Sequence, residues 1–172
     1  MRRFFLPALG LVLVTGCSVG ADENPEPVVQ SSMPPVETEP SDGTPEDEAV
    51  EAYLDFWDAI VLASAEMDPE HPALEEHAVD QALELARLGV QGVVDAGQGM
   101  EGEPALAPEV VSVEPAEDPR TVEIEDCQGS GDWTVVGSGE LESDDVLVTA
   151  TVQRDLFDWW VVEMRIWGEG TC

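Results

Sequence analysis

The stretch DDVLVTATVQRDLFDWWVVEMRIW, residues 144–167, decides the fold because two apolar segments in it alternate with polar residues. Valine or alanine recurs at every second position from Val146 to Val152, and a run rich in tryptophan and valine follows over 159–167. A period of two is typical of β-strands that bury one face. We therefore expect strands over 144–154 and 158–167, paired as an antiparallel hairpin.

The alternation also predicts the register of this hairpin. A loop with an odd number of residues, centred on Leu156, makes one face of the hairpin wholly apolar, whereas an even loop would place Ala150 against Glu163. A slip by one residue exchanges the buried and exposed faces, so we expect the odd loop. The expected pairs are Val152 with Trp160, Ala150 with Val162, Val148 with Met164, and Val146 with Ile166.

Upstream of the hairpin, the pattern is helical as far as residue 96. Thr44-Pro45 offers an N-cap followed by proline at the first helical position, and apolar residues then recur at helical spacing to about Met67. Pro72 opens a short helix, and a longer one runs from about 79 to 96, where glycines end it.

Between the helices and the hairpin, the period changes to two. Val111 and Val113 are expected to share one strand face, and Val122 and Ile124 another. A weaker strand is expected over 133–141. Helices followed by strands favour an α+β fold, with three N-terminal helices packed on a curved antiparallel sheet.

The N-terminus has the pattern of an export signal. Arg2-Arg3 precedes an apolar run over 4–14 that is shorter than the roughly 20 residues needed to span a bilayer. The run ends in Val14-Thr15-Gly16-Cys17, which resembles a bacterial lipobox, where the cysteine thiol receives diacylglycerol. We expect residues 1–16 to be a lipoprotein signal peptide and Cys17 to be lipidated. The paired arginines also resemble a twin-arginine export motif, although general secretion is favoured.

Residues 17–45 are predicted to be a disordered tether. The segment is acidic and rich in proline, and its few apolar residues have no helical or strand period. Such a composition cannot bury enough surface to offset the entropy lost on ordering the backbone. We expect the tether to hold a folded domain, residues 46–172, on the extracytoplasmic side of the cell membrane.

The charge of the chain excludes one class of partner. Six basic residues oppose 38 acidic ones, giving a formal net charge of −32, and none of the basic residues is lysine. Without a basic stripe to displace counterions from phosphates, the chain is not expected to bind nucleic acid. Mutual repulsion also favours a monomer, although Trp159, Val161 and Trp167 would form an apolar patch opposite the expected core.

The order of the elements, the size of the domain and the pair Tyr53 and Trp57 on the first helix resemble the nuclear-transport-factor-2-like cone fold. The chain is similar in particular to small secreted lipoproteins of high-GC Gram-positive bacteria, in which an Asp-Cys strand end and a C-terminal cysteine recur. Here these are Asp126-Cys127 and Cys172. In such a fold the sheet wraps the first helix and leaves a pocket, which some relatives use for ligands or catalysis.

A disulfide between Cys127 and Cys172 is expected. Export places the domain where thiols oxidise, and lipidation of Cys17 leaves two of the three cysteines free to pair. A bridge would pin the C-terminus to the sheet, and it requires the two Cα atoms to lie within about 7 Å of each other.

No pattern in the domain predicts a catalytic centre, a metal site or a cofactor. His71 and His77 are six residues apart, which does not place them on one helical face as metal ligands. The acidic runs over 123–126 and 140–145 lack the spacing of a dedicated calcium loop.

Four aromatic or sulfur-containing side chains could line a cone pocket, although the same residues would also suit a core. These are Tyr53, Trp57, Trp160 and Met164. The predicted function is a membrane-anchored, non-enzymatic binding or accessory domain. The alternatives are a carrier of a small apolar molecule or, less favoured, an enzyme of the isomerase or dehydratase type.

Overall fold

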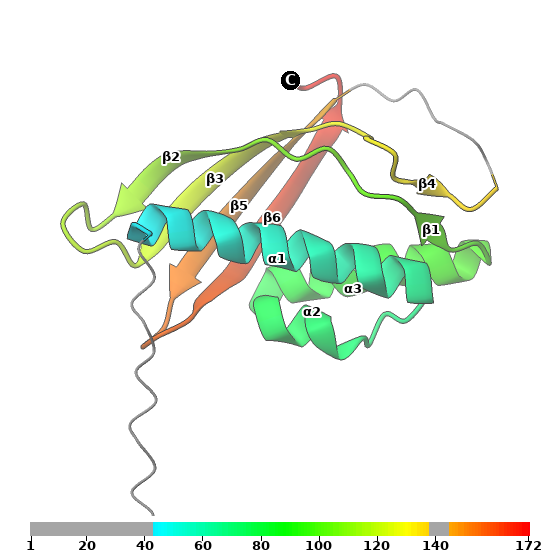
Figure 1. Cartoon of the computed structure of the whole chain (residues 1–172), viewed down its shortest axis with the longest axis horizontal. Coiled ribbons are helices and arrows are strands. Elements are labelled where there is room, and N and C mark those ends of the chain that lie inside the picture. The colour runs from blue at the N-terminus through cyan, green and yellow to red at the C-terminus, as the bar shows by residue number, and fades with distance from the viewer. Residues whose placement is uncertain (1–42, 138–144) are drawn as a thin grey trace, which may run out of the picture. The chain divides into compact units, whose positions relative to one another are not determined.

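A computed structural model describes residues 43–137 and 145–172 (Figure 1). The expected signal peptide and the tether as far as residue 42 lie outside these ranges. The helices are α1 (Pro45–Glu66), α2 (Pro72–His77) and α3 (Asp80–Ala96). The strands are β1 (Met100–Glu101), β2 (Pro108–Glu114), β3 (Thr121–Gln128), β4 (Thr134–Val135), β5 (Val146–Arg154) and β6 (Trp159–Glu169).

The helices begin and end where the sequence predicts. At the start of α1, the Thr44 hydroxyl accepts from the backbone N–H of Asp47, whose carboxylate accepts from the backbone N–H of Thr44. This capping box pairs N–H groups that the first turn of a helix leaves free. Met67 ends α1 and Gly97 ends α3, both in the left-handed conformation. Within the described residues, no helix is both long and apolar enough to cross a membrane.

The fold is α+β, with the helices at 45–96 and a curved antiparallel sheet of order β2-β3-β5-β6. Helix α1 runs across one face of this sheet and contacts all four strands, while α3 packs mainly against β6 (Figure 1). Every second side chain of β3 and β5 points into the core that these helices cover. The alternation along these two strands is therefore the one the sequence predicts.

The predicted register of the β5–β6 hairpin is wrong. The loop over 155–158 has an even number of residues, and the Asp155 N–H donates to the Asp158 carbonyl across it. Val152 consequently pairs with Val161 instead of Trp160. A β-bulge then adds one residue to β6, so that Ala150 pairs with Met164 and the charge of Glu163 stays exposed.

The bulge also changes which positions of β6 face the core. Before it, Trp159 and Val161 face the core, and after it Met164 does. The sequence analysis placed Trp159 and Val161 on the outer face, in a patch with Trp167, but of these three only Trp167 is exposed. When a bulge exchanges the inward and outward positions partway along a strand, a strict period of two cannot predict which side chains are buried.

Strand β2 also contains a bulge, between Val110 and Ser112. Val110 pairs with Ile124 and Ser112 with Glu123, which leaves Val111 unpaired and half exposed, whereas Val113 packs against the core. The expectation that both valines share one face is therefore wrong. The weak strand expected over 133–141 is limited to β4 among the described residues, since 138–144 lie outside them.

The outer edge of the sheet at β6 is partly covered by the junction of α2 and α3. The Val79 N–H donates to the Val161 carbonyl, and the side-chain amide of Gln81 both donates to and accepts from the backbone of Met164. A side chain thus takes the place of a neighbouring strand. Covering an edge in this way limits pairing with other chains.

Cys127 and Cys172 lie at disulfide distance, with their Cα atoms 5.9 Å apart, as the predicted bridge requires. Cys127 belongs to β3, and Cys172 follows the end of β6. Next to the bridge, the Leu147 N–H donates to the Thr171 hydroxyl. The last residues of the chain are therefore attached to the sheet at two points.

Replacing both Cys127 and Cys172 by alanine should lower the free energy of unfolding by up to about 4 kcal/mol, because the bridge joins residues 45 apart in sequence. Urea denaturation of the oxidised protein and of the double variant would measure this loss. Reduction of the unaltered protein should reproduce it. A double variant as stable as the oxidised protein would contradict the stabilising role of the bridge.

Candidate functional site

The strongest candidate site is an apolar pocket of about 330 Å³ between α1, α3 and one end of the sheet. Its volume lies at the lower end of the range of roughly 300–1,000 Å³ that is usual for small-molecule sites. Within the part of the chain that the structure describes, no charged side chain lines it. The lining residues are Trp57, Ile60, Ser64, Leu85, Ala86, Gly89, Val90, Val93, Met100, Gln128, Trp133, Val146, Met164 and Ile166.

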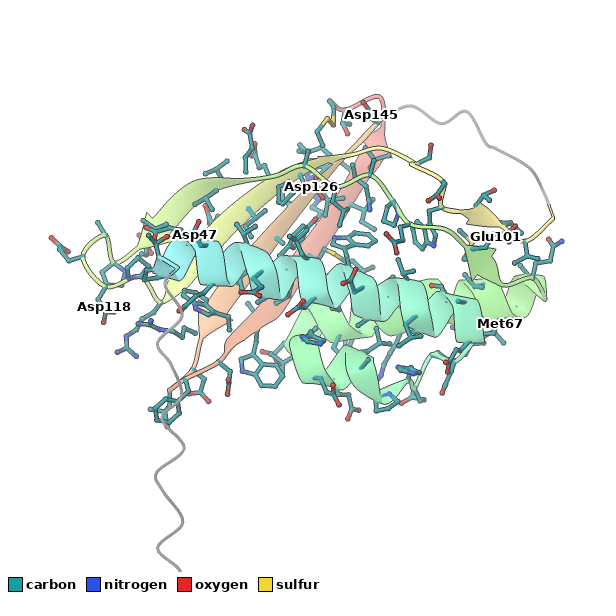
Figure 2. All side chains as sticks on the ribbon, viewed as in Figure 1. Asp47, Met67, Glu101, Asp118, Asp126 and Asp145 are labelled. Atoms are coloured by element: carbon teal, nitrogen blue, oxygen red, sulfur yellow. A yellow bond between two sulfur atoms is a disulfide. The ribbon has the colours of Figure 1, made fainter. Side chains whose placement is uncertain are left out.

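One wall of the pocket is a ribbon that continues the β2–β3 pair beyond the main sheet. Met100 pairs with Val135, and further along the ribbon Ala105 and Gly129 exchange two backbone hydrogen bonds. The ribbon brings two lining residues, Met100 and Trp133, over the helices, and a third, Gln128, is the last residue of β3, next to the ribbon. Figure 2 shows Glu101 of this ribbon above the C-terminal end of α1.

Two glycines allow the halves of the ribbon to approach closely. Gly102 has a φ of 78°, and a Cβ atom there would lie 2.1 Å from the Asp132 carbonyl oxygen. Gly131 has a φ of 56°, and a Cβ atom there would lie 2.5 Å from the Glu103 carbonyl oxygen. Any other residue would be strained and would push the two segments apart. The position of the pocket wall therefore depends on these two glycines.

The pocket lining contains buried hydrogen-bond donors without acceptors. The indole N–H groups of Trp57 and Trp133 and the side-chain amide nitrogen of Gln128 are buried and have no hydrogen-bond partner among residues 43–137 and 145–172. The two indole rings meet edge to face, with centroids 6.1 Å apart. Each unpaired buried donor costs about 1–3 kcal/mol, so three of them around one pocket require an explanation.

A buried hydrogen bond anchors the base of the same region. The Tyr53 hydroxyl donates to the Asp126 carboxylate at 2.9 Å, and the other carboxylate oxygen accepts from the Ala107 N–H at 2.7 Å. Figure 2 shows Asp126 on the sheet, above the middle of α1. Burial, and then the negative Asp126, raise the pKa of Tyr53 far above its usual value. The nearby Trp57 indole N–H opposes this rise, although it does not reach hydrogen-bond geometry with the hydroxyl.

The structure brings two of the four candidate pocket residues to the pocket. Trp57 and Met164 line it, whereas Tyr53 is fully buried in the core beside it. Trp160 lies elsewhere, in a separate hollow beside Val79 and Arg154, because the even hairpin loop turns it away from the helices. Gln128 and Trp133 also line the pocket but were not predicted from the sequence, because the end of β3 and the ribbon bring them to Trp57 from distant parts of the chain.

The outer face of the sheet has a second, polar hollow of about 460 Å³. It includes Glu123, Glu125 and Glu163, together with Arg165, which stacks on the Trp167 ring at 3.9 Å. Asp126, from the same acidic run, points to the core instead. Among the described residues, no three histidine, cysteine or acidic side chains are grouped to hold a metal ion.

The two histidines are separated by the fold. His71 is the N-cap of α2, where its Nδ1 accepts from the Ala73 N–H, and His77 is at the other end of that helix. Asp55 and Asp58, the acidic residues of α1 closest in sequence to Trp57, are exposed. None of these four side chains lines the apolar pocket.

No protein-family model matches the sequence, and no curated protein resembles it closely enough to match. A search of solved structures finds similarity to the intermembrane space region of the chloroplast protein ARC6. That similarity covers 74% of this chain and 99% of the ARC6 chain, at 15% sequence identity and a TM-score of 0.45.

The raised pKa of Tyr53 predicts a specific alkaline behaviour. Tyr53 is the one tyrosine of a chain without lysine, so phenolate absorbance reports this side chain alone. The contribution of Tyr53 to the free energy of unfolding is fully present below about pH 10, the pKa of tyrosine in the unfolded chain. It declines as the pH rises above that value, because only the unfolded chain then ionises its tyrosine. We expect phenolate absorbance to appear together with loss of tertiary structure. Reversible ionisation near pH 10 in the folded protein would contradict this.

Proposed function

We propose that this protein is a lipid-anchored, extracytoplasmic binding domain that holds a small, largely apolar molecule in the pocket between α1, α3 and the ribbon. The single observation that carries the binding part of the proposal is the apolar pocket lined by buried donors that have no acceptors in the described residues. A ligand would supply both the missing acceptors and the missing apolar contacts.

The anchoring part of the proposal rests on the sequence of the N-terminus. Val14-Thr15-Gly16-Cys17 follows a short apolar run that begins after two arginines, and an acidic, proline-rich segment separates it from α1. One lipid-modified cysteine at the end of such a tether would place the pocket outside the membrane surface. The cysteine pair at disulfide distance is consistent with an oxidising location.

The composition of the pocket argues against catalysis there. Ser64 is the one hydroxyl-bearing residue among the described residues of the lining, and no described histidine, lysine or carboxylate accompanies it there to act as a base. General acid–base chemistry needs a titratable group within hydrogen-bond reach of the reacting atom. A binding role is therefore favoured over an isomerase or dehydratase role.

We place the domain with the cone-shaped proteins of the nuclear-transport-factor-2-like type as part of this proposal. Support comes from helices that precede the sheet in the chain and from a pocket between the first helix and the curved sheet. We also propose that the domain is a monomer, because two copies with so large an excess of acidic residues repel each other.

Two glycines of α3 offer a matched pair of variants that tests the pocket. A Cβ atom at Gly89 or Gly92 would meet nothing within 4 Å, but Gly89 lines the pocket and Gly92 does not. Either Gly→Leu change should stabilise α3 by roughly 0.5–1 kcal/mol. Only Gly89→Leu should weaken binding of the neutral fluorescent probe N-phenyl-1-naphthylamine, by at least about tenfold, because its side chain occupies pocket space.

Fluorescence titration of both variants with this probe measures the difference, and thermal unfolding checks that each one folds. Equal binding by Gly89→Leu and Gly92→Leu would place the probe elsewhere. No binding by the unaltered protein would argue against a pocket for apolar molecules.

Cys17→Ser should release the protein from the membrane fraction, because the serine hydroxyl cannot form the thioether to diacylglycerol. Fractionation of cells followed by mass spectrometry of the mature N-terminus would show this. Membrane attachment of the variant equal to that of the unaltered protein, or a mature N-terminus other than Cys17, would contradict lipid anchoring.

A further inference from the structure

We infer that the ligand is an uncharged molecule carrying at least one carbonyl oxygen, which accepts a hydrogen bond from Trp57, Gln128 or Trp133. This inference rests on the proposed binding function and specifies its chemistry. It follows from which polar groups the pocket contains, which of them are unpaired, and which kinds of group are missing from the lining.

The tryptophans differ in whether their indole N–H groups have a hydrogen-bond acceptor. Of the five in the chain, Trp159 donates to Glu48 at 3.1 Å and Trp167 donates to Thr149 at 3.3 Å. Trp57 and Trp133 are the two whose buried indole N–H groups have no acceptor in the described residues, and both line the pocket. A buried Trp N–H usually finds a partner, so these two are suited to an acceptor that enters the pocket.

The side-chain amide of Gln128 provides a third unpaired donor in the pocket lining. Its nitrogen is buried without a partner, and it comes from the end of β3, whereas Trp57 comes from α1. The unpaired groups therefore come from both sides of the pocket, and all of them are donors. A carbonyl oxygen has two lone pairs and can accept from two such groups, whereas a hydrocarbon would leave all of them unpaired.

The charge of the pocket lining also restricts the ligand. No acidic or basic side chain of the described residues lines the pocket, and the lining they form is otherwise almost wholly aliphatic or aromatic. A carboxylate or ammonium group taken into such surroundings would lose its hydration without gaining a counter-charge. The ligand is therefore neutral, and apolar apart from its acceptor.

Two probes of similar size separate the acceptor from the apolar body. 1-Ethylnaphthalene and 1-acetylnaphthalene share one ring system, but only the second has a carbonyl oxygen. The protein used is the mature chain, residues 17–172, with Cys17→Ser, so that no attached lipid dissolves the probes. Two-dimensional NMR of the tryptophan indole N–H groups follows binding, with Trp159 and Trp167 as internal controls because their donors are already paired.

We expect both probes to bind and the ketone to bind about three- to tenfold more tightly, as one added neutral hydrogen bond implies. The indole proton of Trp57 or Trp133 should shift further downfield with the ketone than with the hydrocarbon. Gln128→Leu or Trp133→Phe should reduce the preference for the ketone. Gln91→Leu, which removes an exposed amide bonded to Asp95 outside the pocket, should leave it unchanged.

The outcomes are distinguishable. Equal affinities and equal indole shifts for the two probes would overturn the acceptor inference while leaving the proposed binding function intact. Failure of both probes to bind would overturn the proposed function itself. Tighter binding of the charged analogue 1-naphthoate than of either neutral probe would overturn the assignment of an uncharged ligand.

Discussion

The hydrogen bond from Tyr53 to the buried carboxylate of Asp126 is the contact on which the arrangement of the pocket depends. A buried carboxylate is costly unless its oxygens are paired, and here one accepts from α1 and the other from the Ala107 N–H before β2. The helix, the central strand β3 and the start of β2 are therefore fixed to one another at a single point. Strand β3 stays paired with β5 as far as Gln128, after which the chain continues into the ribbon.

The side chains of three successive residues at this end of β3 contact three different parts of the fold. Asp126 faces the core and holds α1, Cys127 faces outward and joins the C-terminus, and Gln128 faces the pocket. The alternation of a strand accounts for the opposite directions of Asp126 and Cys127. Because the bridge and the buried carboxylate adjoin Gln128, the pocket wall is supported from both sides of the sheet.

The sequence was sufficient to predict the elements whose pattern is local. The cap at Thr44, the end of α3 at Gly97, and the buried faces of β3 and β5 all follow from spacing and residue type. The distance between Cys127 and Cys172 also agrees with the predicted bridge. The fold class was therefore within reach of the sequence alone.

The parts that could not be predicted depend on contacts between distant segments. In β6 the odd-numbered residues face the core before the bulge and the even-numbered ones after it. The strict alternation therefore predicted Trp159 and Val161 on the outer face and Trp160 in the pocket, and both predictions were wrong. Trp133 reaches the pocket because two glycines let the ribbon close, whereas Gln128 lines it from the end of β3. Gly131, two residues before Trp133, is the one local feature that could have indicated a constrained turn there.

We infer that the pocket is open and that its unpaired N–H groups donate hydrogen bonds to an oxygen atom of the ligand. A crystal structure of the protein with 1-acetylnaphthalene tests this claim most directly. The account predicts the naphthalene ring among the apolar side chains of α1 and α3, with the carbonyl oxygen about 3 Å from the nitrogen of Trp57, Trp133 or Gln128. A pocket filled by the protein's own side chains, with each of these nitrogens bonded to a protein oxygen, would contradict it.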